Sequence, residues 1–286
     1  MRVLIAPAPF KGSLSSIAAA DAIARGLRAG WPDAELSTTP LADGGEGTLH
    51  VLHSARDGTL ERVTVTDPFG RAIEAQLGWL PGAIAVVEMA QAAGLALMTD
   101  EERDPMRAST HGVGESIRKA LDGGAREIWI GLGGSATVDG GLGMLQALGA
   151  QLLDDAGRPV SGGGQGLRDL ASVDLSTLDA RLSRTPLKAL CDVDSPLLGP
   201  QGAQLYMLQK GATTEQCEEL ASGLARFADL VERDLAGDVR DVAGAGAAGG
   251  LGAALTLLGA DLVSGSRFVM DALDLDRKLA SCDLVI

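Results

Sequence analysis

The chain has 286 residues, of which 46% are hydrophobic and 22% charged, so it can form one large or two modest domains with a substantial core. Its net charge of −14 argues against nucleic acid as a partner, because binding to a phosphate backbone needs a basic surface. Aromatic residues make up only 3%, so the core must be built from Ala, Leu, Val and Ile, which favours helices packed on parallel strands.

The three cysteines Cys191, Cys217 and Cys282 are widely spaced and form no C-x-x-C pair. This spacing supports neither a zinc knuckle nor a disulfide framework, and it fits a reduced compartment. The N-terminal apolar run is too short for a signal peptide, and no segment is long and apolar enough to span a bilayer. We therefore expect a cytoplasmic protein without a membrane partner.

A β-α-β pattern opens the chain. Residues 3–6 form an apolar strand, a helix with one apolar face ends at Gly30, and residues 36–39 form the next strand. Such a unit predicts a right-handed parallel pair. Lys11 follows the first strand at the carboxyl edge of this sheet, where open α/β folds bind ligands, although its position fits a solvated loop lysine equally well.

The second strand leads into a segment in which Asp43 and Glu46 lie among three glycines. The two carboxylates could hold Mg²⁺ with part of its water shell retained. The alternative is a tight turn in which Glu46 lies favourably near a helix N-terminus.

Three alternating segments follow, at residues 61–66, 71–80 and 83–89, and they predict an antiparallel meander. The change from β-α-β to meander indicates a domain boundary near residues 60–70. Glu88 ends the third segment and is either a solvent-facing acid or a buried acid with a function.

A glycine-rich stretch, Gly131–Gly143, lies between a predicted strand at residues 126–130 and a predicted helix at residues 144–149. A strand, a glycine loop and a helix form an anion-binding turn, because free N–H groups and the helix dipole favour negative charge. Ser135, Thr137 and Asp139 suit a phosphate, a metal or a helix cap. Dinucleotide-like glycine spacings occur here and at residues 244–249, but a single such match is weak evidence.

Further strands are predicted at residues 187–193, where Asp192 follows the apolar run, and at residues 204–208, which lead to Lys210. Thr213 and Gln216 form a capping box for a long helix. Residues 282–286 resemble a buried strand with no turn or helix after it, from which we expect a partial sequence and an unstable or sticky isolated fragment.

Eight motifs, in order along the whole chain, resemble the type I glycerate kinases. The matching stretches lie at residues 5–13, 42–48, 88–95, 131–143, 191–197, 209–212, 244–250 and 283–286. The chain departs from the family pattern at Ala8-Pro9, Val138, Ser195 and Met207-Leu208, and it lacks the family's C-terminal portion.

The resemblance implies an α/β fold of two domains with the active site in the cleft between them. One is a Rossmann/flavodoxin-like domain with a parallel sheet, formed by residues 1–65 and completed by about 265–286; the other is an inserted mixed-sheet α/β domain at residues 66–264. It also implies ATP and Mg²⁺ as cofactors, glycerate as the substrate and 2-phosphoglycerate as the product. It leaves the oligomeric state open.

Phosphoryl transfer depends mainly on positioning and charge neutralisation, which suggests roles for the matching residues. Lys11, Lys210 and the general base Asp192 are the catalytic candidates, and Arg71, Asp43 and Glu46 are the substrate-binding candidates. Gly133, Gly134, Ser135 and Thr137 would bind the ATP phosphates, and Asp43, Glu46 or Asp139 would hold Mg²⁺. The alternatives are a kinase for another short hydroxy acid and a non-catalytic nucleotide- or anion-binding protein.

Overall fold

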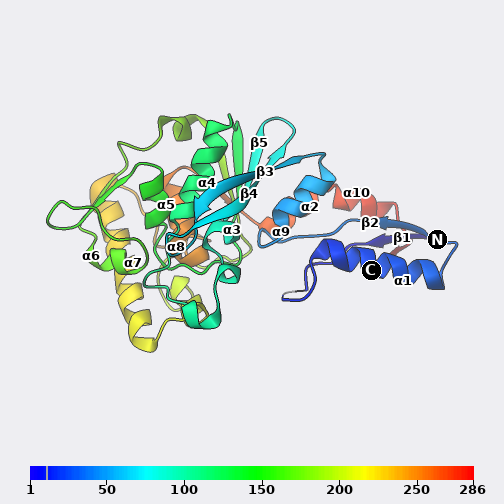
Figure 1. The fold of residues 1–286 in the computed structure, drawn as a ribbon, viewed down its shortest axis with the longest axis horizontal. Helices are drawn as coiled ribbons and strands as arrows, with labels where there is room; N and C mark the ends of the chain where they lie inside the picture. The colour runs from blue at the N-terminus through cyan, green and yellow to red at the C-terminus, as the bar shows by residue number, and fades with distance from the viewer. Residues whose placement is uncertain (11) are drawn as a thin grey trace.

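The computed structural model describes residues 1–10 and 12–286, so the candidate residue Lys11 lies outside the described residues. The elements form two α/β parts of unequal size, and both chain termini lie in the smaller part (Figure 1). One part has a parallel sheet to which N- and C-terminal residues both contribute, and the other has a mixed sheet. The predicted fold class is therefore confirmed.

The smaller sheet has three parallel strands in the order β11 (Leu284–Val285), β1 (Arg2–Ile5), β2 (Glu35–Thr38). Helix α1 (Ser16–Gly30) connects β1 to β2, and the Ser15 hydroxyl caps it by accepting a hydrogen bond from the N–H of Ala18 at 3.1 Å. The opening β-α-β prediction is thus confirmed. Arg2 and Asp283 form an ion pair at 2.9 Å that joins the two ends of the chain. This contact lowers the pKa of Asp283 to about 2.

The larger sheet has six strands, and its parallel half positions the candidate site. The strand order is β10 (Asp261–Val263), β9 (Leu187–Leu190), β6 (Glu127–Gly131), β5 (Ile84–Glu88), β4 (Ala72–Leu80), β3 (Thr59–Thr66). Strands β3, β4 and β5 form the predicted antiparallel meander, whereas β5, β6, β9 and β10 run parallel. All of β3 belongs to this sheet, so the chain changes sheets between Thr38 and Thr59.

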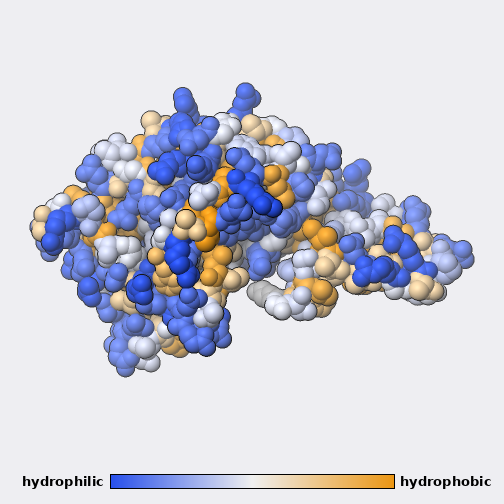
Figure 2. Space-filling view, in the orientation of Figure 1, coloured by the Kyte–Doolittle hydropathy of each residue, from blue (hydrophilic) through white to orange (hydrophobic). Residues whose placement is uncertain are grey.

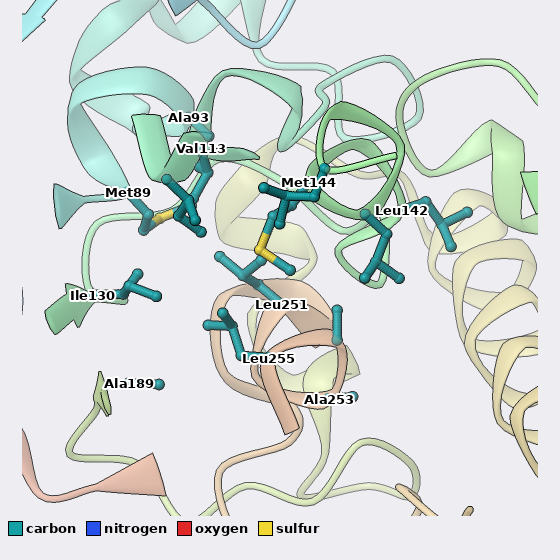
Figure 3. Packing of buried hydrophobic residues seen from close by; sticks show 14 of the residues in the cluster. Met89, Ala93, Val113, Ile130, Leu142, Met144, Ala189, Leu251, Ala253 and Leu255 are labelled. Atoms are coloured by element: carbon teal, nitrogen blue, oxygen red, sulfur yellow. The ribbon is translucent and has the colours of Figure 1, made fainter. Parts of the chain in front are cut away.

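Helices cover both faces of the larger sheet. One face packs against α3 (Ala90–Ala93), α4 (His111–Asp122), α5 (Leu142–Ala147) and α8 (Ala247–Leu257). Figure 3 shows this core, with Ile130 and Ala189 of the strands facing Met144 and Leu251 of the helices. The amphipathic α7 (Thr214–Leu235), which begins at the predicted capping box, lies outside this layer beside α6 (Gln165–Asp169).

Helices α2 (Thr48–Ala55) and α9 (Gly265–Ala272) cover the opposite face and link the two parts. Leu49 and Leu52 of α2 pack on the sheet, and Phe268 of α9 meets Trp129 edge-on with ring centroids 4.7 Å apart. Val51 and Val269 form a separate cluster between these helices. A short helix, α10 (Leu275–Ala280), then leads to β11.

The predicted strand at residues 204–208 is wrong. Two 3-10 turns, Ala203–Tyr206 and Leu208–Lys210, occupy this segment. Only Met207 and Ala203 turn into the core, whereas Leu205 and Leu208 are exposed, so the apolar run does not have the alternating burial of a strand.

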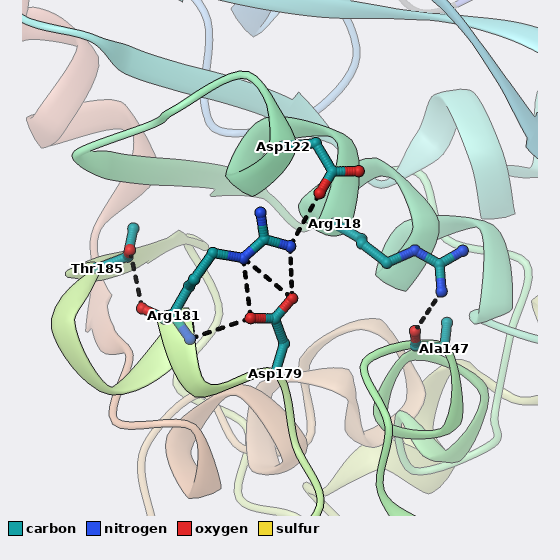
Figure 4. Close-up of polar contacts among 6 residues, drawn as sticks. All are labelled: Arg118, Asp122, Ala147, Asp179, Arg181 and Thr185. Atoms are coloured by element: carbon teal, nitrogen blue, oxygen red, sulfur yellow. Dashed lines mark hydrogen bonds and ion pairs between the residues drawn. The ribbon is translucent and has the colours of Figure 1, made fainter.

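A polar cluster lies at the C-terminal end of α4 in the larger part. Arg181 binds Asp179 and reaches Asp122 at 2.9 Å (Figure 4). These contacts lower the pKa of Asp179 to about 2, mainly through the guanidinium of Arg181. The remaining strands, β7 (Gln151–Leu153) and β8 (Ser172–Asp174), form a separate antiparallel pair.

Phe227→Ala is expected to lower the free energy of unfolding by about 3–5 kcal/mol, because Phe227 of α7 is fully buried and truncation leaves a cavity. Urea denaturation followed by circular dichroism measures this loss. Leu208→Ala is the control, since that side chain is 65% exposed and should change the value by less than about 0.5 kcal/mol. Equal losses in the two variants would contradict this view of the core.

Candidate active site

The candidate residues gather at the carboxyl edge of the four parallel strands. Strands β5, β6 and β9 end at Glu88, Gly131 and Leu190, and the segments that follow them carry the predicted motifs. This is the edge at which open α/β sheets bind ligands, because helix-connected loops meet there.

Two glycine loops meet back to back at this edge. A Cβ atom on Gly131 would lie 2.5 Å from the carbonyl oxygen of Gly44, and one on Gly133 would lie 2.5 Å from the Cα of Gly45. The N–H of Gly133 donates to the carbonyl of Gly44 at 3.2 Å. Larger residues at 131 and 133 would therefore force apart the Asp43–Gly47 segment, hereafter the acid loop, and the Gly131–Gly143 stretch.

The acid loop presents both of its carboxylates to solvent. Asp43 and Glu46 are exposed, and Oδ1 of Asp43 accepts a hydrogen bond from the N–H of Gly45 at 2.9 Å. Within the described part of the chain, no group of three or more His, Cys, Asp or Glu side chains is arranged to hold a metal ion. The donor set therefore fits an ion such as Mg²⁺, which keeps waters and uses one or two carboxylates together with substrate phosphates.

The glycine stretch contains N–H groups that donate to no acceptor within the described residues, among them the adjacent pair at Gly134 and Ser135. The N–H groups of Leu132, Gly133 and Ala136 donate to backbone carbonyls. Those of Gly134, Ser135, Thr137, Val138 and Asp139 have no acceptor among residues 1–10 and 12–286; of these five residues Gly134 is exposed and the others are buried. Adjacent free N–H groups at a loop form a small anion-binding site.

Lys210 lies directly behind these N–H groups. Its Nζ donates to Oγ of Ser135 at 2.7 Å and to the carbonyl of Thr137 at 2.8 Å, and the residue is only 6% exposed. Burial lowers the pKa of Lys210 to about 7, against the opposing influence of Asp139. The hydroxyl of Thr137 is buried and has no hydrogen-bond partner among the described residues. The structure thus brings together Ser135, Thr137 and Lys210, which the sequence predicts as site residues.

Asp139 shapes the glycine stretch from inside. It is fully buried and accepts hydrogen bonds from the N–H and hydroxyl of Thr110 and from the N–H groups of Gly141 and Gly143. Burial raises its pKa, and these hydrogen bonds oppose the rise. The first N–H groups of α5 therefore face this carboxylate, so the helix dipole is directed at Asp139 and not at a free anion.

Asp192 follows β9 and lines a pocket of about 210 Å³ with Cys191, Asp194, Gly244 and Ser264. Its carboxylate accepts hydrogen bonds from the hydroxyl of Ser264 at 2.7 Å and from the N–H of Ser266 at 3.0 Å. These contacts at the start of α9 fix an otherwise exposed acid in one orientation.

The second dinucleotide-like glycine run packs against the first. The N–H of Gly140 donates to the carbonyl of Gly249 at 3.0 Å, and a Cβ on Gly249 would lie 2.1 Å from the carbonyl oxygen of Thr137. Positive φ angles at Ala248, Gly249 and Gly250 allow this approach. Close packing explains these glycines without a cofactor.

Comparison with known proteins agrees with this arrangement. Residues 3–286 match the model of the glycerate kinase family. The chain belongs to the glycerate kinase family. It is therefore a kinase.

Relatives in this family match the chain along its whole length. The glycerate kinase of Bacillus subtilis is 47% identical and the glycerate 2-kinase of Escherichia coli 45% identical, each over 100% of the chain and 76% of the relative. A crystal structure named for glycerate kinase 2 from Salmonella typhimurium superposes with a TM-score of 0.89 at 49% identity, covering 100% of this chain and 77% of the other.

In this glycerate kinase family member, Arg71 belongs to a cluster around the ring of Phe69. Arg71 pairs with Asp67 and, at 3.0 Å, with Glu102, and its guanidinium lies 5.5 Å from the ring centroid. Burial opposes ionisation of Asp67, yet its hydrogen bonds with Arg71 hold the pKa of that carboxyl below its usual range.

Arg107 was missed by sequence reasoning. It is exposed, and its guanidinium lies 5.6 Å from the ring centroid of Phe69. No ion pair of Arg107 occurs among residues 1–10 and 12–286. Thr110, which binds Asp139, was missed as well. Neither residue lies in a glycine-rich or acid-rich motif, so no local pattern marks them.

None of the helices within residues 1–10 and 12–286 combines the length and the apolar character needed to cross a membrane.

The Lys210→Met variant is expected to have a flatter dependence of stability on pH between about 7 and 10.5. The folded-state pKa of Lys210 is about 7 and the ordinary value is 10.5, so the unfolded chain holds more protons in this window and wild-type stability rises with pH there. The rise due to this group is at most about 1.4 kcal/mol per pH unit. Urea denaturation at pH 7, 8 and 9 measures it, and parallel curves for the two proteins would contradict a neutralised lysine.

Proposed function

We propose that this protein phosphorylates glycerate to 2-phosphoglycerate with ATP and Mg²⁺, in the cleft between its two parts. The observation that carries the proposal is the back-to-back contact of the two glycine loops. It packs Gly45, which lies between Asp43 and Glu46 in the acid loop, against Gly133, which directly precedes Gly134 and Ser135. Figure 2 shows the surface notched between the smaller and larger parts. The family membership supports the same reaction.

The glycine stretch would bind the γ-phosphate of ATP, which is the group that is transferred. The N–H groups of Gly134 and Ser135 would donate to phosphate oxygens, and Gly133 and Thr137 keep the loop in shape. Lys210 acts through Ser135, since its Nζ is already bonded to that hydroxyl. Asp43 and Glu46 would hold Mg²⁺, which supplies neutralisation of phosphate charge when bound. Asp139 is assigned to the loop's shape because four hydrogen bonds occupy it.

Asp192 is the proposed general base. The 2-hydroxyl oxygen of glycerate forms a bond to the γ-phosphorus while the bond from that phosphorus to the bridging oxygen of ADP breaks. The hydroxyl proton moves to the Asp192 carboxylate. Lys11 keeps its proposed role in neutralising charge, on the basis of its sequence position.

A purified-protein assay tests the function. ADP release is measured with ATP, Mg²⁺ and a panel of short hydroxy acids, and ³¹P NMR compares the product with authentic 2- and 3-phosphoglycerate. We expect turnover with glycerate and the 2-phosphate product. Turnover only with another acid, or ATP binding by calorimetry without any turnover, would overturn the proposal.

Asp192→Asn is expected to lower kcat about 10²–10⁴-fold while ATP affinity changes little, because the variant removes the proton acceptor and keeps the side-chain shape. Asp261→Asn is the control, since Asp261 is exposed at the opposite end of β10. A kcat near the wild-type value would rule out Asp192 as the base. Thermal unfolding checks that the capping contacts to Ser264 and Ser266 survive.

Arg107→Gln is expected to raise KM for glycerate roughly 10- to 100-fold with kcat little changed, as loss of one charged hydrogen bond to a carboxylate would do. The sequence predicts Arg71 as the substrate-binding arginine, but Arg71 is held by two acids, whereas the guanidinium of Arg107 is free of ion pairs in the described part of the chain. We therefore propose that Arg107 binds the glycerate carboxylate. Arg62→Gln, an exposed arginine on β3, is the matched control. If KM is the same in both variants, the carboxylate binds elsewhere.

A further inference from the structure

We infer that Glu88 is a positioning residue that fixes the acid loop against the glycine stretch. This inference rests on the proposed function for the meaning of the acid loop, but its geometry is independent of substrate identity. Glu88 is the last residue of β5 and is only 4% exposed. Neither the motif roles nor the proposed chemistry uses it.

Glu88 caps a helix that does not cap itself. The N-cap of α2 is Gly47, which has a φ of 92° and offers no side chain. Instead, Oε1 of Glu88 accepts a hydrogen bond from the N–H of Leu49 at 2.6 Å, across 39 residues of sequence. A carboxylate at this place satisfies a free N–H group and complements the helix dipole. The start of α2 is therefore tied to the sheet and not to its own loop.

A second set of contacts fixes the direction of the Glu88 carboxylate. Its Oε2 accepts a hydrogen bond from Nε2 of Gln91 at 3.3 Å, and Oε1 of Gln91 accepts one from the N–H of Gln76 at 2.7 Å. Gln91 therefore links Glu88 to β4. Because Gln91 is hydrogen-bonded to the backbone of β4, the orientation of the Glu88 carboxylate is fixed relative to the sheet. The carboxylate can therefore hold the start of α2 in place.

The glycine stretch completes the enclosure. A Cβ on Gly131 would lie 3.9 Å from Cγ of Glu88 and 2.5 Å from the carbonyl oxygen of Gly44. Glu88 thus lies under the point where the acid loop and the glycine stretch meet. Burial raises its pKa, while the Leu49 N–H and Gln91 oppose the rise. A buried carboxyl group with a shifted pKa is typical of functional sites.

The consequence concerns Asp43 and Glu46. Residues 47–49 follow Glu46 directly, so a shift at the start of α2 moves this carboxylate relative to Gly133 and Gly134. Holding the N–H of Leu49 therefore sets the separation between the proposed metal ligands and the proposed phosphate donors. Small displacements of such groups reduce rates strongly, because phosphoryl transfer depends on alignment.

The test compares Glu88→Ala, Glu88→Gln and Asp234→Asn. Asp234 is the matched control: its carboxylate also accepts a long-range backbone hydrogen bond, from Val173 at 2.9 Å, far from the candidate site in sequence. Amide hydrogen exchange of a peptide covering residues 43–52 and Mg²⁺ binding in the presence of ATP by calorimetry are the readouts. Steady-state kinetics with glycerate accompany them.

We expect Glu88→Ala to speed exchange in residues 43–52 about tenfold or more, with α4 and α7 unchanged, and to weaken Mg²⁺ binding about tenfold. Glu88→Gln keeps an acceptor oxygen for Leu49 and should recover most of the protection. Asp234→Asn should leave both readouts at wild-type values. Wild-type exchange in Glu88→Ala, or an equal increase over α4 and α7, would overturn the inference, the latter by showing general destabilisation.

These outcomes separate the two proposals. If the wild-type protein does not phosphorylate glycerate, the proposed function fails, and the exchange and Mg²⁺ measurements still decide whether Glu88 positions the acid loop. If the wild-type protein is active and the Glu88→Ala variant shows normal exchange and normal Mg²⁺ binding, the inference about Glu88 fails alone.

Discussion

The candidate site depends on a contact between two pieces of backbone. The acid loop and the glycine stretch approach so closely that Gly131 and Gly133 have no room for a side chain, and a hydrogen bond from Gly133 to Gly44 fixes their register. A glycine in a loop usually allows either the close approach of a ligand or a tight turn. Here the tolerance for close approach allows two protein backbones to pack together, and the groups proposed to bind phosphate are the neighbouring residues Gly134 and Ser135.

Two buried ionisable side chains hold the rest of the glycine stretch in its conformation. Lys210 binds Ser135 and the carbonyl of Thr137, and Asp139 gathers the N–H groups at the start of α5. Both groups lose solvation on burial. Burial raises the pKa of Asp139 and lowers the pKa of Lys210, so in each case it favours the neutral form. Hydrogen bonds that compensate for the lost solvation run to residues of the glycine stretch. The same interactions therefore stabilise the two buried side chains and fix the conformation of the stretch.

The sequence was sufficient for the parts of the fold that follow from local patterns. The β-α-β unit, the meander and the capping box at Thr213 all have periodic or capping signals, and each is present. The segment at residues 204–208 was misread because a short apolar run without alternating burial fits a strand or a turn equally well.

Most of the candidate site was also recognisable from its motifs, since Ser135, Thr137 and Lys210 do meet. The contacts of Arg107 and Thr110 were not, because they arise from packing between segments that carry no motif. Glu88 was noticed only as an acid at the end of an apolar strand. Its partner at the start of α2 comes from tertiary structure, which no spacing within the chain expresses.

The way the chain crosses between its two parts has a mechanical consequence. The larger part is inserted into the smaller one, so the chain passes between them once on the way from β2 to α2 and again from β10 toward β11. The two crossings touch, since a Cβ on Gly265 would lie 2.2 Å from the carbonyl oxygen of Asp43. The acid loop is thus part of the connection between the two parts, so a rotation of one part against the other would displace a segment of the candidate site itself.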